Sequence, residues 1–221
     1  MDLSTPRMLR TRMLAGAMCF LLSSCAGYRG GWESIPYIGS PPPVPSVSRT
    51  GYELRKRMEL ALPGLILSVR LNNVSIDSDI QIYAYVIPVP GYSVDTPSDE
   101  PKKAQVTLFI EPQEEGFVFR PLLATLSVRG QSASGLGGYT TRKLIGFEGG
   151  KVIWEEPKRI ADELPLSSGK FYSFFVEFPL PALSPQAPDV TLDLSKALQA
   201  PGQPTIPLIR FLPVRWGNWY G

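Results

Sequence analysis

The side chains that most often carry chemistry are scarce in this chain. It contains no histidine and two cysteines, Cys19 and Cys25. Without histidine, the Ser-His-Asp and Cys-His mechanisms of nucleophile activation are excluded, and so are the Cys/His ligand sets typical of zinc sites. Carboxylates are the remaining groups for acid–base chemistry or metal binding. We expect no cofactor and no metal site.

The carboxylates that could bind a cation lie in two turn-like stretches. Asp77 and Asp79 follow an Asn-Asn pair, and Asp95, Asp99 and Glu100 lie in a segment rich in polar residues. Calcium needs six to eight oxygen ligands, and the chain has no EF-hand or RTX repeat. Asp in a turn has a sufficient local role, because its side chain bonds nearby backbone. A glycosidase-like carboxylate pair stays an alternative, because such a pair is defined by its spacing in the fold.

A serine and a lysine have a spacing that allows catalysis without histidine. In Ser167-Ser168-Gly169-Lys170 the lysine follows the first serine by three positions, which is similar to the motif of penicillin-interacting serine enzymes. Those enzymes place the motif at a helix start and add S-D-N and K-T-G elements, which this chain lacks. We therefore predict a turn before the aromatic segment that follows, and no catalytic residue.

The most unusual surface candidate is the aromatic run at the end of the sequence, Arg215 to Gly221. Trp216, Trp219 and Tyr220 combine large area with a hydrogen-bonding edge, so they could stack on sugar rings or anchor a protein partner. The simpler alternative is that they cap one end of the fold. Both interpretations stay open, and capping is favoured.

The first 25 residues have the pattern of an export signal. Leu22-Ser23-Ser24-Cys25 closes an uncharged run of ten residues, Met13 to Leu22, that is too short to span a bilayer and is preceded by Arg7, Arg10 and Arg12. The four residues resemble the lipobox of bacterial lipoproteins. The resemblance implies that residues 1–24 are a signal peptide and that Cys25 is lipidated and becomes the N-terminus. In that family Asp after the cysteine retains the protein at the inner membrane; Ala26 stands here, which implies the outer membrane, facing the periplasm.

Charge and composition then limit the partners. Removal of residues 1–24 takes away three arginines and Asp2, so 22 basic and 20 acidic side chains become 19 of each. A chain with no basic excess lacks the electrostatic footprint of a nucleic-acid binder.

The residues from 25 to 50 are rich in Gly and Pro, and we expect a flexible tether in which Trp32, Tyr37 and Ile38 are able to touch the domain.

Alternating apolar and polar residues predict strands from residue 51 onward. The predicted strands are 58–62, 65–71, 80–87, 106–111, 117–119, 124–128, 152–154, 171–178, 190–194 and 206–214, with a loop or hairpin over 130–150. The aromatic strand 171–178 is expected to be central, and 206–214 to be an edge strand because Pro207 and Pro213 interrupt it.

Short strands separated by Pro/Gly-rich loops, with no helices between them, predict an all-β fold. We expect one antiparallel β-sandwich over residues 51–221, Ig-like in the loose architectural sense. The function expected from these features is non-enzymatic: a lipid-anchored envelope protein whose partners are the bilayer, through acylated Cys25, and another envelope protein. A glycan or peptidoglycan binder that uses exposed Trp and Tyr is the first alternative, and a carboxylate-dependent envelope enzyme the second.

Overall fold

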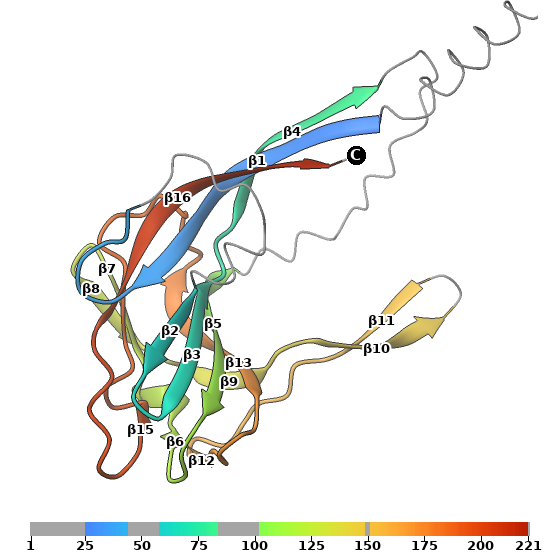
Figure 1. The fold of residues 1–221 in the computed structure, drawn as a ribbon. Coiled ribbons are helices and arrows are strands. Elements are labelled where there is room, and N and C mark those ends of the chain that lie inside the picture. The colour runs from blue at the N-terminus through green and yellow to red at the C-terminus, as the bar shows by residue number, and fades with distance from the viewer. Residues whose placement is uncertain (1–24, 44–57, 84–101, 149–150, 221) are drawn as a thin grey trace, which may run out of the picture.

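A computed structural model describes residues 25–43, 58–83, 102–148 and 151–220 (Figure 1). These residues are nearly all β, and a single 3-10 turn, Pro121–Leu123, is the one helical element among them. Every strand pair is antiparallel. The predicted all-β antiparallel sandwich is confirmed. No helix in the described ranges has the length and apolar character needed to cross a bilayer.

One layer is a six-stranded sheet in the order β4-β1-β16-β14-β7-β8. Its strands are β1 (Cys25–Tyr37), β4 (Ser75–Tyr83), β7 (Thr125–Val128), β8 (Gln131–Ser134), β14 (Thr191–Asp193) and β16 (Ile209–Tyr220). The long strands β1, β4 and β16 extend well beyond the other strands of this sheet (Figure 1). We call their outer part, residues 25–31, 76–83 and 216–220, the stalk.

The second layer is a five-stranded sheet in the order β2-β3-β5-β13-β9. Its strands are β2 (Glu59–Leu62), β3 (Leu65–Leu71), β5 (Lys103–Pro112), β9 (Gly137–Thr140) and β13 (Tyr172–Pro181). The aromatic strand β13 lies between β5 and β9, so the prediction of a central position is confirmed. Pro63 and Gly64 join β2 to β3, and Gly64 has a φ of 65°, a conformation that glycine adopts without steric cost.

Two smaller sheets complete the structure. β6 (Val118–Phe119) pairs with β12 (Leu164–Pro165) and with β15 (Leu198–Gln199) at the end of the sandwich far from the stalk (Figure 1). β10 (Lys143–Glu148) and β11 (Lys151–Glu155) form a hairpin that projects from the body (Figure 1). We call this hairpin the arm.

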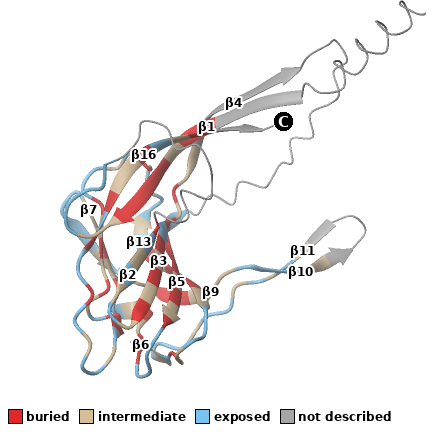
Figure 2. Ribbon diagram, in the orientation of Figure 1, coloured by how far each residue is buried: buried red, intermediate tan, exposed pale blue. Residues whose placement is uncertain are grey.

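The core lies between the two large sheets (Figure 2). Alternate residues of β3, β5 and β13 face it, and β7, β14 and β16 cover them from the other layer. The stacked rings of Phe119 and Phe174, with centroids 5.7 Å apart, extend the core toward the smaller sheet. The buried side chains contributed by these strands are Leu65, Leu67, Val69, Leu71, Val106, Leu108, Ile110, Phe174, Val176, Phe178, Leu126, Leu192, Ile209 and Phe211.

Two predictions about strand positions are wrong. Residues 25–37 were expected in a flexible tether, but they form β1, which pairs with β4 on one side and β16 on the other. Of the glycines that indicated a tether, Gly30 and Gly31 flank a bulge, and Gly30 pairs with Gly217 of β16. Ile38 packs against the main core, and residues 44–50 of the expected tether lie outside the described residues.

The last strand is also not an edge strand. β16 lies between β1 and β14, and it starts at Ile209, after Pro207. Pro213 is accommodated because β14 pairs only with the first two residues of β16. In the described structure, β1 is the one strand paired with β16 from residue 211 onward, so a proline there interrupts at most one ladder.

Candidate functional site

The stalk brings together residues that are far apart in the sequence. Its central strand pairs Cys25 with Tyr83 of β4, Gly27 with Tyr220 of β16, and Tyr28 with Trp219. The predicted lipidation site and two of the three predicted aromatic site residues therefore lie within four residues along β1. The side chains at this end of the stalk are outside the described part of the structure. These residues are therefore placed by the pairing of their backbones alone.

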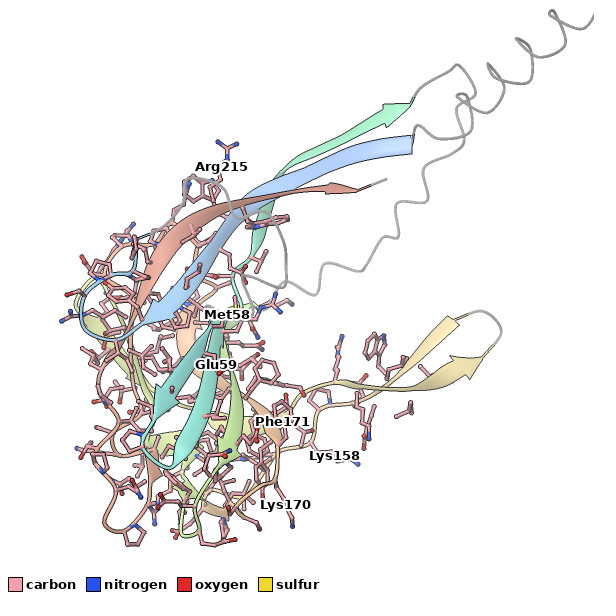
Figure 3. The ribbon with its side chains drawn as sticks, viewed as in Figure 1. Met58, Glu59, Lys158, Lys170, Phe171 and Arg215 are labelled. Carbon is pink, nitrogen blue, oxygen red and sulfur yellow. The ribbon has the colours of Figure 1, made fainter. Side chains whose placement is uncertain are left out.

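Trp216, the third predicted aromatic residue, lies at the inner end of the stalk. It pairs with Gly31 and packs against a small apolar cluster formed by Ile35 and Val214. Its side chain is half-buried, and its indole Nε1 is buried without a hydrogen-bond partner among the described residues. Neighbouring Arg215 is exposed and points away from the body (Figure 3). Trp216 thus makes packing contacts with the Ile35 and Val214 cluster, and both the capping and the binding interpretations of the aromatic run stay predictions.

A buried polar cluster joins the base of the stalk to the sandwich. Asn73 Nδ2 donates to Ser34 Oγ at 2.9 Å, and Ser34 Oγ donates to the carbonyl oxygen of Pro185 at 3.1 Å. These contacts connect β1 to the segment that follows β3 and to the loop after β13. Asn73 Oδ1 is buried without a hydrogen-bond partner among the described residues, so the cluster is only partly satisfied, and the two bonds that do form join β1 to the body.

Glu33 is the charged member of this region. It is 5 % exposed, and its Oε1 lies 3.8 Å from Nε of Arg70 on β3. Burial raises the pKa of the Glu33 carboxyl, although the positive charge of Arg70 acts in the opposite direction. Sequence reasoning missed Glu33 and Ser34 because both fall in the stretch that its glycines and prolines marked as a tether. The signal that could have found them is the Trp32-to-Ile38 segment, in which apolar residues recur.

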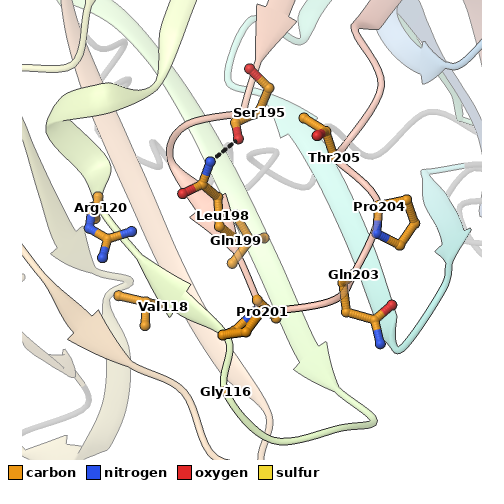
Figure 4. A pocket seen from close by; sticks show the side chains of 11 residues that line it. Gly116, Val118, Arg120, Ser195, Leu198, Gln199, Pro201, Gln203, Pro204 and Thr205 are labelled. Atoms are coloured by element: carbon orange, nitrogen blue, oxygen red, sulfur yellow. Dashed lines mark hydrogen bonds between the residues drawn. The ribbon is translucent and has the colours of Figure 1, made fainter.

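A cavity of about 330 Å³ lies at the other end of the sandwich, between β6, β15 and the loop that follows β15 (Figure 4). Arg120 is the one charged residue in its lining, and its guanidinium is bonded to both carboxylate oxygens of Glu163, at 2.9 and 3.2 Å. Gln199 Nε2 donates to the carbonyl oxygen of Ser195 at 2.8 Å. The cavity's lining therefore includes no carboxylate, and these polar groups are bonded within the protein.

The Ser167–Lys170 segment is the predicted turn. The Lys170 amide donates to the Ser167 carbonyl, and Gly169 has a φ of 69°. Ser168 Oγ donates to the carbonyl of Gln113 at 2.9 Å, and Lys170 is exposed at the outer surface (Figure 3). The structure describes both side chains of the Ser-x-x-Lys pair, and the bond between these two residues is the backbone one, with none between their side chains.

The carboxylates considered for calcium are not brought into a described site. Asp77 and Asp79 are on β4, where side chains are outside the described part, and residues 95–100 lie outside it altogether. Among the residues that the structure does describe, no three His, Cys, Asp or Glu side chains come together as metal ligands.

No protein-family model, curated protein or solved structure matches this chain. Its function must therefore be argued from its own residues. The arrangement that most clearly combines sequence features with geometry is the stalk.

Proposed function

We propose that this chain is a lipid-anchored protein of the bacterial cell envelope that acts without enzymatic activity, by binding another envelope protein or supporting an envelope assembly. In this proposal residues 1–24 are removed, Cys25 is acylated, and the anchor holds the protein at the outer membrane, facing the periplasm. The observation that carries the proposal is the register of the stalk, which places Cys25 at its outer end among aromatic residues.

The aromatic residues of the outer stalk suit a membrane–water interface. Tyr28 and Trp219 share one rung, Tyr220 follows on the next, and Tyr83 is paired with Cys25 itself. Trp and Tyr are enriched at the level of lipid headgroups, because their rings are apolar and their edges form hydrogen bonds. An acyl chain on Cys25 would bring these residues to that level.

The stalk gives the anchor a defined reach. Cys25 and Ile35 are ten residues apart on one strand, which at about 3.3 Å per residue corresponds to about 33 Å. Because three paired strands resist bending more than a free chain does, the sandwich would be held away from the bilayer by a semi-rigid spacer. A spacer of this kind suits a protein that presents a surface to a partner in the periplasm.

The non-enzymatic role is supported by the chemistry of the chain. It lacks histidine, and the described cavity beside Arg120 has no carboxylate in its lining. At Ser167 and Lys170, the bond among the described residues is between backbone atoms, with no side-chain pairing of a nucleophile and a base. Binding through shape and strand edges needs none of these groups.

The anchor is tested by labelling. Cells that express the full chain are fed radioactive palmitate with and without globomycin, and the mature N-terminus is identified by mass spectrometry. We expect label on the wild type, no label on Cys25→Ala, and accumulation of the unprocessed form with globomycin. A mature chain that begins at any residue other than an acylated Cys25 would overturn the proposal.

The partner is tested by crosslinking and affinity capture from envelope membranes, followed by a sacculus pull-down. Capture of one envelope protein in stoichiometric amount is the expected result. Binding to purified sacculi that is lost in Trp219→Ala and Tyr220→Ala, and retained in the packing variant Trp216→Ala, would instead support the glycan-binding alternative.

A further inference from the structure

The arm is a second projecting element, and nothing in the proposed anchor explains it. β10 and β11 form a two-stranded sheet of their own that leaves the body between β9 and the loop before β12 (Figure 1). Three of its apolar side chains are exposed: Leu144 by 44 %, Ile145 by 59 % and Trp154 by 50 %. An isolated two-stranded hairpin is marginal in water, and a third strand or a packed face is needed for stability.

The two outer edges of the arm differ. β10 carries a bulge at Ile145, where the register with β11 shifts between Leu144 and Gly146. Bulges disrupt a strand edge and protect it from pairing. β11 runs without a bulge from Lys151 to Glu155, and within the described residues it pairs with β10 and with no other strand. The regular, unpaired edge of the arm is therefore that of β11.

The sequence of β11 is complementary to itself in antiparallel pairing. It reads Lys-Val-Ile-Trp-Glu, with a positive residue first and a negative residue last. If Ile153 is placed opposite Ile153 of a second copy, Lys151 lies opposite Glu155 and Val152 opposite Trp154, twice each. A parallel pairing would instead place lysine opposite lysine and glutamate opposite glutamate, which is unfavourable.

We infer that β11 is a self-association edge, at which two copies of this chain join their arms into one four-stranded antiparallel sheet in the order β10-β11-β11-β10. A two-fold axis passes through the Ile153 pair. Such a contact uses the same surface of both copies and closes on itself, and the bulged β10 strands at its outer edges stop further addition. The occupant of the β11 edge is a second copy of this chain, and the inference does not depend on the lipid anchor.

The charge on Glu155 is maintained in the single chain. Its carboxylate is bonded to Lys158, and this hydrogen bond together with the charges of Lys158 and Lys143 lowers the pKa of Glu155. The Glu155 carboxylate is thus ionised at neutral pH before any second copy approaches, and in the dimer it would face Lys151 in addition to its own Lys158 and Lys143.

Charge reversal tests the pairing directly. The full chain and its variants are purified in detergent, and their dimer dissociation constants are measured by sedimentation equilibrium. Lys151→Glu has glutamate at both ends of β11, and Glu155→Lys has lysine at both ends, so each variant alone places like charges opposite each other. We expect each to dissociate about tenfold more readily than the wild type, or more, because like charges directly opposite are destabilising.

The mixture of the two variants provides the decisive measurement. One copy then presents two glutamates and the other two lysines, so every cross-pair is again opposite in charge. We expect the mixture to recover a dimer of nearly wild-type affinity. Within each copy, the substituted residue still lacks an opposite charge across from it on β10, so the recovery would come from the contact between the two copies. A monomeric wild type, or variants that remain dimeric, or a mixture that stays monomeric would each overturn the inference.

A crosslink places the contact in the envelope. Ile153→Cys, at the two-fold axis, is oxidised in intact membranes and analysed for a disulfide-linked homodimer, beside the wild type and Leu136→Cys, an exposed residue of the body. The expected homodimer forms only with Ile153→Cys. A dimer in the wild type would instead report an unacylated Cys25, which concerns the anchor and not the arm, and a crosslink from residue 153 to another protein would overturn self-association.

Discussion

Glu33 lies in a stretch that was predicted to be a flexible tether, but its side chain is buried in the fold. A buried carboxyl beside a partly exposed Arg70 keeps its proton more tightly in the folded chain than in the unfolded one, since burial raises its pKa above the usual value of 4.5. The folded state is thus favoured relative to the unfolded chain below that value, and this contribution is lost as the pH rises through the raised pKa.

Glu33→Gln should remove this pH dependence. Between about pH 4 and about pH 7 we expect the melting temperature of the variant to rise relative to that of the wild type, because only the wild type must ionise a buried group. Circular dichroism at a series of pH values measures the difference. Glu156→Gln, at an exposed carboxylate, is the control and should show little change. A difference between Glu33→Gln and wild type that is constant across this range would contradict the explanation.

At the scale of the elements, Trp216 decides between two interpretations of the aromatic run. Its contact with the Ile35 and Val214 cluster predicts that Trp216→Ala destabilises the fold by about 2 kcal/mol, less than the roughly 3–5 kcal/mol of a fully buried tryptophan because the side chain is only partly buried. Denaturant unfolding of dilute, monomeric protein measures this. Trp154→Ala, on the exposed arm, should change the unfolding free energy little. Equal effects of the two substitutions would rule out the packing role.

The strands show what sequence patterns can and cannot predict. Leu65–Leu71 was predicted with the bounds it has, because one face is buried and the other is partly exposed, and this produces the period of two. β1 was missed because its glycines belong to a bulge and to pairings that depend on β4 and β16 and not on neighbouring residues. The prediction that 206–214 is an edge strand failed for the same reason, because β1, which flanks β16 on one side, comes from the other end of the chain. The proximity of Cys25 to Tyr220 is likewise a property of this long-range pairing.

At the scale of the whole molecule, the two large sheets share one core, and this predicts a single cooperative unfolding transition. Leu108 of β5 is fully buried and belongs to the core cluster that also contains Leu192 and Ile209 of the other layer. Leu108→Ala should cost about 2–5 kcal/mol, as large-to-small core substitutions do. The stalk is continuous with β16, which contributes Ile209 and Phe211 to that core, so it should lose its structure in the same transition.

Near-ultraviolet circular dichroism follows core packing, and proteolysis within residues 25–37 follows β1; both are measured across one denaturant series. We expect coincident midpoints in the wild type, and the same shift of both midpoints in Leu108→Ala. Leu123→Ala, at a residue that is 46 % exposed, is the matched control and should leave both unchanged. If β1 became cleavable at a lower denaturant concentration than the one at which core packing is lost, the stalk would be an independent unit. The stability of the sandwich would then no longer maintain the spacing of about 33 Å between Cys25 and Ile35.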